Sequence, residues 1–134
     1  MATLRGIHHV AISIPPERHV ASVRFYRDVL GFEELPVPES LTSVPIITWF
    51  RIGGNELHLI EEPNDPGDVR RHICFEVDEL EPFRERLERN GEQTLEADHI
   101  PGRPRFFCYD PAGNRLEFLV DEAAETNGRK ADVP

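Results

Sequence analysis

The sequence predicts an α+β fold made of two copies of one module, each with a strand, a helix and three further strands. The first observation is an internal repeat. Gly54–Ile60 returns 59 residues later as Gly113–Leu119, and both segments read Gly-Asn, any residue, Leu, a ligand-type residue and two apolar residues. The second observation is that each half opens with an alternating segment followed by one of helical period. Because a half of roughly 55 residues buries too little surface alone, the halves are expected to fold together.

The first module is expected to span about residues 5–62. Its predicted elements are a strand over 7–14, a helix over about 18–30, and strands over 32–37, 46–52 and 55–62. Pro15 and Pro16 end the first strand and suit the start of a helix, and Gly31 is a natural helix stop. The strand over 46–52 is rich in β-branched and aromatic residues, and a glycine pair turns it into the last strand.

The second module is expected to span about residues 70–121 and to repeat this order. Its predicted elements are a strand over 71–77, a helix from after Asp78 to about 90, and strands over 94–97, 105–109 and 114–120. Asp78 suits a helix N-cap, and Glu81 three residues later completes a capping-box pattern. The run Asp110–Gly113 has Asp, Pro and Gly at the positions that favour a type I turn.

Charge and composition exclude several classes of partner. The chain has 25 acidic and 15 basic residues and a formal net charge of -10, so it repels nucleic acid and anionic membranes. No apolar run approaches the ~18 residues of a membrane span, and Met1–Ile7 lacks the apolar core of a signal peptide. Cys74 and Cys108 form no CxxC motif and no disulfide framework. We therefore expect a reduced, cytoplasmic protein that binds a small molecule.

Four ligand-type residues are predicted to share one side of the sheet. Side chains alternate along a strand, so when the apolar neighbours of these residues cover the helices, the four residues face the opposite side. Imidazoles and a carboxylate are ligands for a divalent transition metal. In the alternative interpretation, the histidines are hydrogen-bonded core residues, and the carboxylate pairs with Arg105 or Arg115. The four residues are His9, His58, His72 and Glu117.

Four segments carry a resemblance to a known family: His9–Ile12, Phe25–Phe32, Arg71–Val77 and Asp110–Glu117. Together they resemble the vicinal oxygen chelate superfamily, which includes glyoxalases, bleomycin-resistance proteins and extradiol dioxygenases. The resemblance covers nearly the whole chain, from Ile7 to about Val120. It implies that the two βαβββ modules form one cupped mixed sheet in a single domain over residues 1–121. Residues 122–134 are then expected to be a flexible tail.

The resemblance also implies a metal site. It assigns His9, His58, His72 and Glu117 as ligands of a divalent ion (Ni, Zn, Co, Mn or Fe(II)), and Glu117 as the catalytic base. One departure stands out, because bacterial glyoxalase I enzymes carry a glutamate where this chain has His58. Extradiol dioxygenases and fosfomycin thiol transferases use two histidines and one glutamate. His9, His72 and Glu117 would satisfy that set, and His58 would then lie beside the metal or face the substrate.

The implied function is that of a metal-dependent enzyme of the lyase or isomerase type. Such an enzyme acts on a small oxygenated substrate, for example a thiol adduct, through metal-chelated vicinal oxygens and an enediolate. The alternatives are an Fe(II) ring-cleaving dioxygenase and a metal-loaded binding protein without turnover. Arg103, Arg105 and Trp49 are the predicted substrate-binding residues. A homodimer is expected, because two-fold dimers are common in the superfamily and each module leaves open strand edges.

Overall fold

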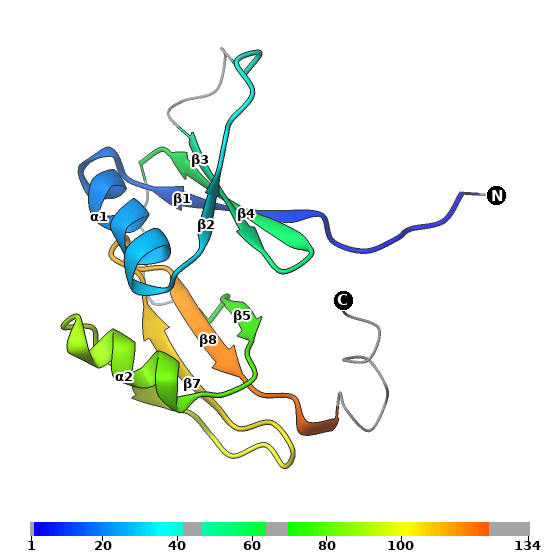
Figure 1. Cartoon of the computed structure of the whole chain (residues 1–134), viewed down its shortest axis with the longest axis vertical. Helices are drawn as coiled ribbons and strands as arrows, with labels where there is room; N and C mark the ends of the chain where they lie inside the picture. The colour runs from blue at the N-terminus through cyan, green and yellow to red at the C-terminus, as the bar shows by residue number, and fades with distance from the viewer. Residues whose placement is uncertain (1, 42–46, 64–69, 124–134) are drawn as a thin grey trace. The chain divides into compact units, whose positions relative to one another are not determined.

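The computed structural model describes residues 2–41, 47–63 and 70–123. The chain divides into two compact units, residues 1–66 and 67–134, here the first unit and the second unit. Each unit contains a strand, a helical segment and three more strands, in that order (Figure 1). The predicted α+β class with a repeated βαβββ module is therefore confirmed. Among the described residues, no helix has the length and apolar character needed to cross a membrane.

The first unit holds a four-stranded mixed sheet in the order β1-β4-β3-β2. The strands are β1 (His9–Ile14), β2 (Glu33–Leu35), β3 (Ile47–Ile52) and β4 (Asn55–Glu61). β1 pairs with β4 in parallel, and the other two pairings are antiparallel. Gly53 adopts a φ of 58° at the turn between β3 and β4, which glycine reaches without steric cost. The glycine pair therefore makes the hairpin that the sequence predicts.

The predicted helix over about 18–30 is present, but its geometry changes along its length. A 3₁₀ turn, η1 (Pro16–Arg18), leads into α1 (His19–Arg24), which continues as a π-helical segment, η2 (Phe25–Val29). The N–H of Leu30 donates to the carbonyl of Phe25 at 2.9 Å, five residues back. This wider winding brings a group of bulky side chains onto one face, each at most 3 % exposed. The group consists of Phe25, Tyr26, Val29 and Leu30.

The second unit holds a sheet with the same order of pairing, β5-β8-β7-β6. The strands are β5 (Ile73–Glu76), β6 (Leu95–Glu96), β7 (Arg105–Tyr109) and β8 (Arg115–Leu119), and the helix is α2 (Glu81–Arg89). β5 pairs with β8 in parallel, as β1 does with β4. The helix covers the apolar face of this sheet, because Phe83 stacks on Phe118 with ring centroids 5.5 Å apart. The repeat in the sequence is thus a repeat of strand pairing.

Two local predictions in the second unit have different outcomes. The type I turn is confirmed, because Gly113 N–H donates to the carbonyl of Asp110 at 2.9 Å. The Asp110 carboxylate also accepts a hydrogen bond from the N–H of Asn114 at 2.8 Å. The capping box at Asp78 is wrong: α2 begins after Leu80, and no side chain caps it. Pro82 in the first turn lacks the N–H that such a cap would serve, so little is lost there.

Side chains alternate across both sheets as the sequence predicts. In the first unit, Leu57 and Leu59 of β4 are fully buried, and His58 between them faces the other way. In the second unit, Leu116 and Phe118 of β8 are fully buried, and Glu117 lies between them. The apolar set forms the core under the helix of each unit. The face opposite the helices is therefore the one that carries the ligand-type residues.

Candidate functional site

The first unit presents a stack of three rings, here the first-unit stack: His9, His58 and Trp49. His58 lies between the other two, with centroids 4.1 Å from His9 and 4.2 Å from Trp49, and all three rings are nearly parallel. The strand pairing explains this arrangement, because Trp49 is directly opposite His58 across β3 and β4, and β1 borders β4 on its other side. The Nε1 donor of Trp49 is buried and has no hydrogen-bond partner among the described residues.

A carboxylate fixes the central ring of this stack. Nε2 of His58 lies 2.9 Å from Oε1 of Glu56, and His58 is only 6 % exposed. The hydrogen bond with His58 is the main reason that the pKa of Glu56 is below its usual value. Glu56 is therefore ionised at neutral pH and holds His58 in place.

His9, at the end of the stack, is kept in the form that binds metals. Loss of hydration lowers its pKa below the ordinary value, and the neighbouring imidazoles of His58 and His8 lower it further. Its Nδ1 lies 3.0 Å from Nδ1 of His8. Its Nε2 has no hydrogen-bond partner among the described residues. A neutral imidazole with a free nitrogen is the form that coordinates a metal ion.

The second unit pairs a histidine with a buried carboxylate. Nδ1 of His72 lies 2.7 Å from the backbone carbonyl of Arg70, and a carbonyl can only accept, so Nδ1 carries the proton. Nε2 of the same ring lies 2.8 Å from Oε1 of Glu117. In the neutral ring, Nε2 and the carboxylate are both acceptors, so they approach this closely only around a proton or a cation. Two ligands about 2.1 Å from one metal stand about 3 Å apart at a right angle, so the pair fits a divalent ion.

The other oxygen of Glu117 is also occupied. Nη1 of Arg105 lies 3.2 Å from Oε2 of Glu117, which is only 4 % exposed. Arg105 in turn donates to the carbonyl of Asp98 at 3.1 Å, so its position is fixed from both sides.

Burial, and next the charge of Glu117, raise the pKa of the Cys74 thiol to about 12. Cys74 is therefore protonated at neutral pH and is not a nucleophile.

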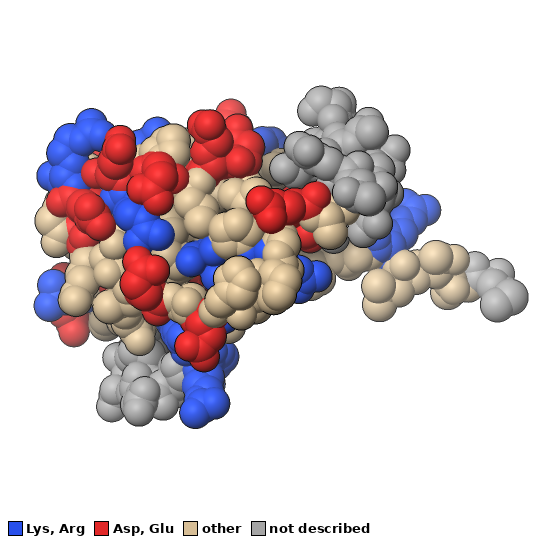
Figure 2. Space-filling model, turned by 90° about the horizontal axis from the view of Figure 1, so that it is seen from below, with Lys and Arg blue, Asp and Glu red and all other residues tan. Residues whose placement is uncertain are grey.

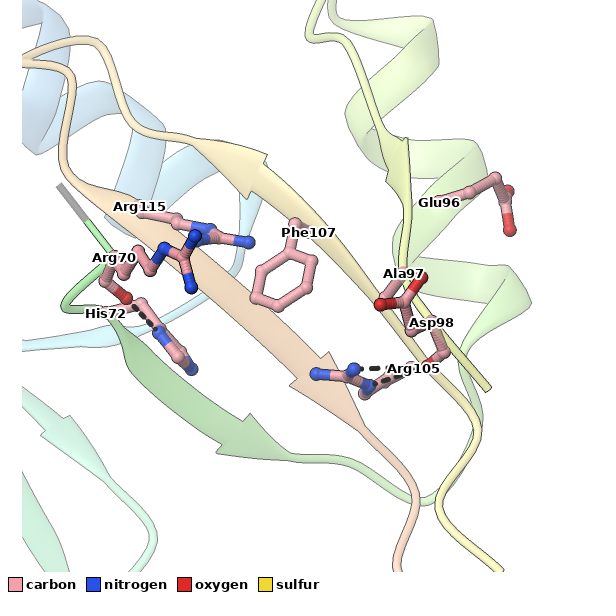
Figure 3. A pocket seen from close by; sticks show the side chains of 8 residues that line it. All are labelled: Arg70, His72, Glu96, Ala97, Asp98, Arg105, Phe107 and Arg115. Atoms are coloured by element: carbon pink, nitrogen blue, oxygen red, sulfur yellow. Dashed lines mark hydrogen bonds between the residues drawn. The ribbon is translucent and has the colours of Figure 1, made fainter. Parts of the chain in front are cut away.

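A pocket of about 360 Å³ opens beside this pair, here the second-unit pocket. The ring of Phe107 lies at its centre in Figure 3, and the guanidinium carbon of Arg115 is 4.0 Å from the ring centroid. His72 meets the same ring edge-on at 5.4 Å. Phe107 is directly opposite Glu117 across β7 and β8, so the strand pairing places the pocket next to the carboxylate. Its lining is Arg70, His72, Glu96, Ala97, Asp98, Arg105, Phe107 and Arg115.

The structure brings the predicted ligands together as two pairs, one in each unit. Among residues 2–41, 47–63 and 70–123, it gathers no three His, Cys, Asp or Glu side chains closely enough to hold a metal ion. The four-ligand site therefore stays a prediction. Of the predicted substrate-binding residues, Arg105 lines the second-unit pocket, Trp49 belongs to the first-unit stack, and Arg103 is exposed and outside the lining. The predicted homodimer also stays a prediction.

Sequence reasoning predicted only His72 and Arg105 among the lining residues as ligand or substrate-binding groups. It placed Arg115 on the same face as Glu117 without predicting that it binds substrate, and it did not consider Arg70 or Phe107. A signal for Phe107 and Arg115 was available in the repeat. Phe107 occupies the place in its sheet that Trp49 occupies in the first, opposite the ligand-type residue. Arg115 stands two residues before Glu117, as Glu56 stands before His58. Arg70 lies before the first strand of its unit, where no strand pattern marks its direction.

The fold and these pairs define a two-module protein with imidazole and carboxylate groups on the face opposite its helices. The chain belongs to the Glyoxalase/Bleomycin resistance protein/Dioxygenase superfamily, which it matches over residues 6–118. This confirms the family that the sequence resembles. No curated protein matches the sequence.

Solved structures agree with this family. A putative glyoxalase family protein from Bacillus anthracis is 31 % identical, with a TM-score of 0.81 over 90 % of this chain and 98 % of that one. A glyoxalase family protein from Enterococcus faecalis is 30 % identical, with a TM-score of 0.67 over 86 % and 97 %. FosX, a fosfomycin resistance protein from Listeria monocytogenes, shares the fold at 18 % identity, with a TM-score of 0.76 over 88 % and 93 %. That FosX structure contains Mn(II) and a dihydroxypropylphosphonic acid.

Proposed function

We propose that this chain is a metal-dependent enzyme of the lyase or isomerase type that acts on a small oxygenated substrate. The observation that carries the proposal is the contact of His72 with Glu117 at 2.8 Å, with the other nitrogen of His72 fixed by a backbone carbonyl. His9, His72 and Glu117 are the proposed ligands of one divalent ion. A metal ion bound there would act as a Lewis acid on two adjacent substrate oxygens and ease removal of a proton next to a carbonyl.

The protein groups divide the remaining work. Arg105 holds Oε2 of Glu117, so Oε1 is the oxygen that faces His72 and the proposed metal ligand. The same oxygen would serve as the proton acceptor when it is not bound to the ion. The burial of Glu117 excludes water from this oxygen. In the first unit, Glu56 and the stacked ring of Trp49 keep the ring of His58 in place. His58 thus positions the neighbouring ring of His9 rather than serving as a fourth ligand.

The test is turnover by wild type and Glu117→Gln with metal content normalised. The glutamine keeps the shape and one coordinating oxygen but loses the charge and the basicity. With the hemithioacetal of glutathione and methylglyoxal as substrate, we expect Glu117→Gln to fold, to retain some metal and to lose about 10²-fold or more in turnover, the scale of a general base. The matched control is Glu85→Gln, which removes an exposed carboxylate on α2 and should keep full turnover.

Two outcomes would change the proposal. Full activity in Glu117→Gln would remove Glu117 as the base. If wild type is slow on the hemithioacetal, His58→Glu should raise its turnover, because that change restores the two-carboxylate arrangement of bacterial glyoxalase I. A slow wild type that gains nothing from this change would argue against the glyoxalase reaction.

A second candidate function is an Fe(II)-dependent ring-cleaving dioxygenase. The observation in its favour is that His58 is already hydrogen-bonded to Glu56 and stacked on Trp49. Two histidines and one carboxylate, His9, His72 and Glu117, are then left as ligands. This set is the one that non-haem Fe(II) oxygenases use, with positions left open for oxygen and substrate. Oxygen uptake by the Fe(II)-loaded protein with a catechol separates the two functions, because the isomerase reaction consumes no oxygen.

A further inference from the structure

The second-unit pocket contains two arginines that form an ion pair with no described carboxylate. Arg105 is paired with Glu117, and Glu96 is paired with Arg84 at 3.1 Å. In the described part of the chain, the guanidinium groups of Arg70 and Arg115 have no such ion pair. This is unusual in a chain with 25 acidic and 15 basic residues, and on the face drawn in Figure 2 the basic side chains lie among acidic ones. Two unpaired arginines in one pocket point to an anionic ligand.

Arg115 is held where such a ligand could meet it. Its guanidinium carbon is 4.0 Å from the centroid of Phe107, a ring that is only 6 % exposed. The ring is fixed in turn by its place in β7 and by its T-shaped contact with His72. A guanidinium stacked on a fixed aromatic face has already lost most of its rotational freedom, so binding costs less entropy. Its in-plane N–H groups remain available to two oxygens of an anion.

The other charges of the pocket locate the anion within it. Asp98 also lines the pocket, and its carboxylate would repel an anion. In Figure 3, Asp98 and Arg105 lie across Phe107 from Arg70 and Arg115. The end with Arg70 and Arg115 is therefore the one that favours an anion. His72 lies at the same end, and the backbone carbonyl of Arg70 accepts the hydrogen bond that orients the His72 ring.

We propose that Arg70 and Arg115 bind an oxyanion group of the substrate, a carboxylate or a phosphoryl group, on the Phe107 side of His72. The substrate class is thus a small anionic molecule whose charged group lies next to its metal-chelating oxygens. The second half of this statement rests on the proposed function, because it takes His72 as a metal ligand. The anion site itself requires no metal.

The experiment measures binding of inorganic phosphate and of acetate to chelator-treated full-length protein at constant ionic strength, by calorimetry. Wild type should bind at least one of them saturably, and the tighter ligand identifies the charged group. Arg115→Gln and Arg70→Gln should each weaken binding by about 10-fold or more, the scale of a charge-assisted hydrogen bond. Arg115→Lys should retain part of the affinity for the anion, since lysine keeps the positive charge but lacks the paired N–H donors of a guanidinium. The matched control is Arg89→Gln, an exposed arginine at the end of α2, which should bind as wild type does.

The outcomes separate this inference from the proposed function. Absence of saturable binding by both anions, or equal weakening by Arg89→Gln, would overturn the anion site. The metal content of Arg115→Gln should equal that of wild type, and His72→Asn should lose metal while it still binds the anion. Anion binding in a protein that takes up no metal would leave the anion site standing and remove the proposed function. Metal uptake without anion binding would do the reverse.

Discussion

The two units have the same strand order and pairing, yet the same face carries different groups in each. His9 is the first residue of β1, and His72 directly precedes β5. In each unit, an aromatic ring is opposite the ligand-type residue of the last strand. Two positions before that ligand-type residue, the units carry side chains of opposite charge: Glu56 in the first unit and Arg115 in the second. Glu56 turns inward to the neighbouring His58, whereas Arg115 lies on Phe107 without a carboxylate partner among the described residues.

This difference teaches how a repeated module can divide one function. In the first unit, the carboxylate of Glu56 and the ring of Trp49 both hold the ring of His58, so these groups are suited to positioning. In the second unit, Nε2 of His72 faces the carboxylate of Glu117. The second-unit pocket beside this pair also contains two arginines, Arg70 and Arg115, without an ion pair among the described residues, so it is suited to binding and reaction. The strand pairing shared by the two modules determines where the side chains lie. The residue types at equivalent positions, such as Glu56 and Arg115, determine which charges and ligands each module presents.

The largest expected effect comes from the two cores. Phe50 and Phe118 are both fully buried. The ring centroid of Phe118 lies 5.1–5.5 Å from those of three other rings, Phe75, Phe83 and Phe106. Replacing either residue by alanine should reduce the free energy of unfolding by about 3–5 kcal/mol, because each leaves a cavity. If the two units form the single domain that the sequence predicts, both variants should shift the same single transition in urea. Two transitions, each lowered by only one variant, would show units that unfold independently. Tyr109→Ala is the matched control, because that ring is 45 % exposed.

The smallest expected effect comes from the end of the chain. Asp121 is buried, and the N–H of Glu122 donates to the carbonyl of Gly102 at 2.9 Å. The predicted tail over 122–134 lies largely outside the described residues, of which Ala123 is the last. Because the sequence beyond it has no apolar period, cutting the chain after Ala123 should change the melting temperature by less than about 1 °C. Cutting after Val120 removes these contacts and should lower it measurably. An equal, large loss from both cuts would show that the tail packs on the body.

The sequence predicts the strands, the turn at Asp110 and the faces of His58, His72 and Glu117, because all of these depend on local alternation and turn chemistry. It does not predict the π-helical winding at Phe25, because the helical period of the apolar residues there does not mark a change in the number of residues per turn. Nor does it predict the second-unit pocket, because the position of Phe107 beside Glu117 depends on the register between strands.

The measurement that tests the central claim most directly is the metal content of untagged protein by elemental analysis. Wild type should hold about one divalent ion per chain, since the proposed ligands form one site. His9→Ala and His72→Ala each remove one proposed ligand, one from each unit, and each should lose most of the metal. Chelation should also lower the melting temperature of wild type, because an ion that binds only the folded state stabilises it. If both variants are as rich in metal as wild type, the assignment of these ligands is contradicted.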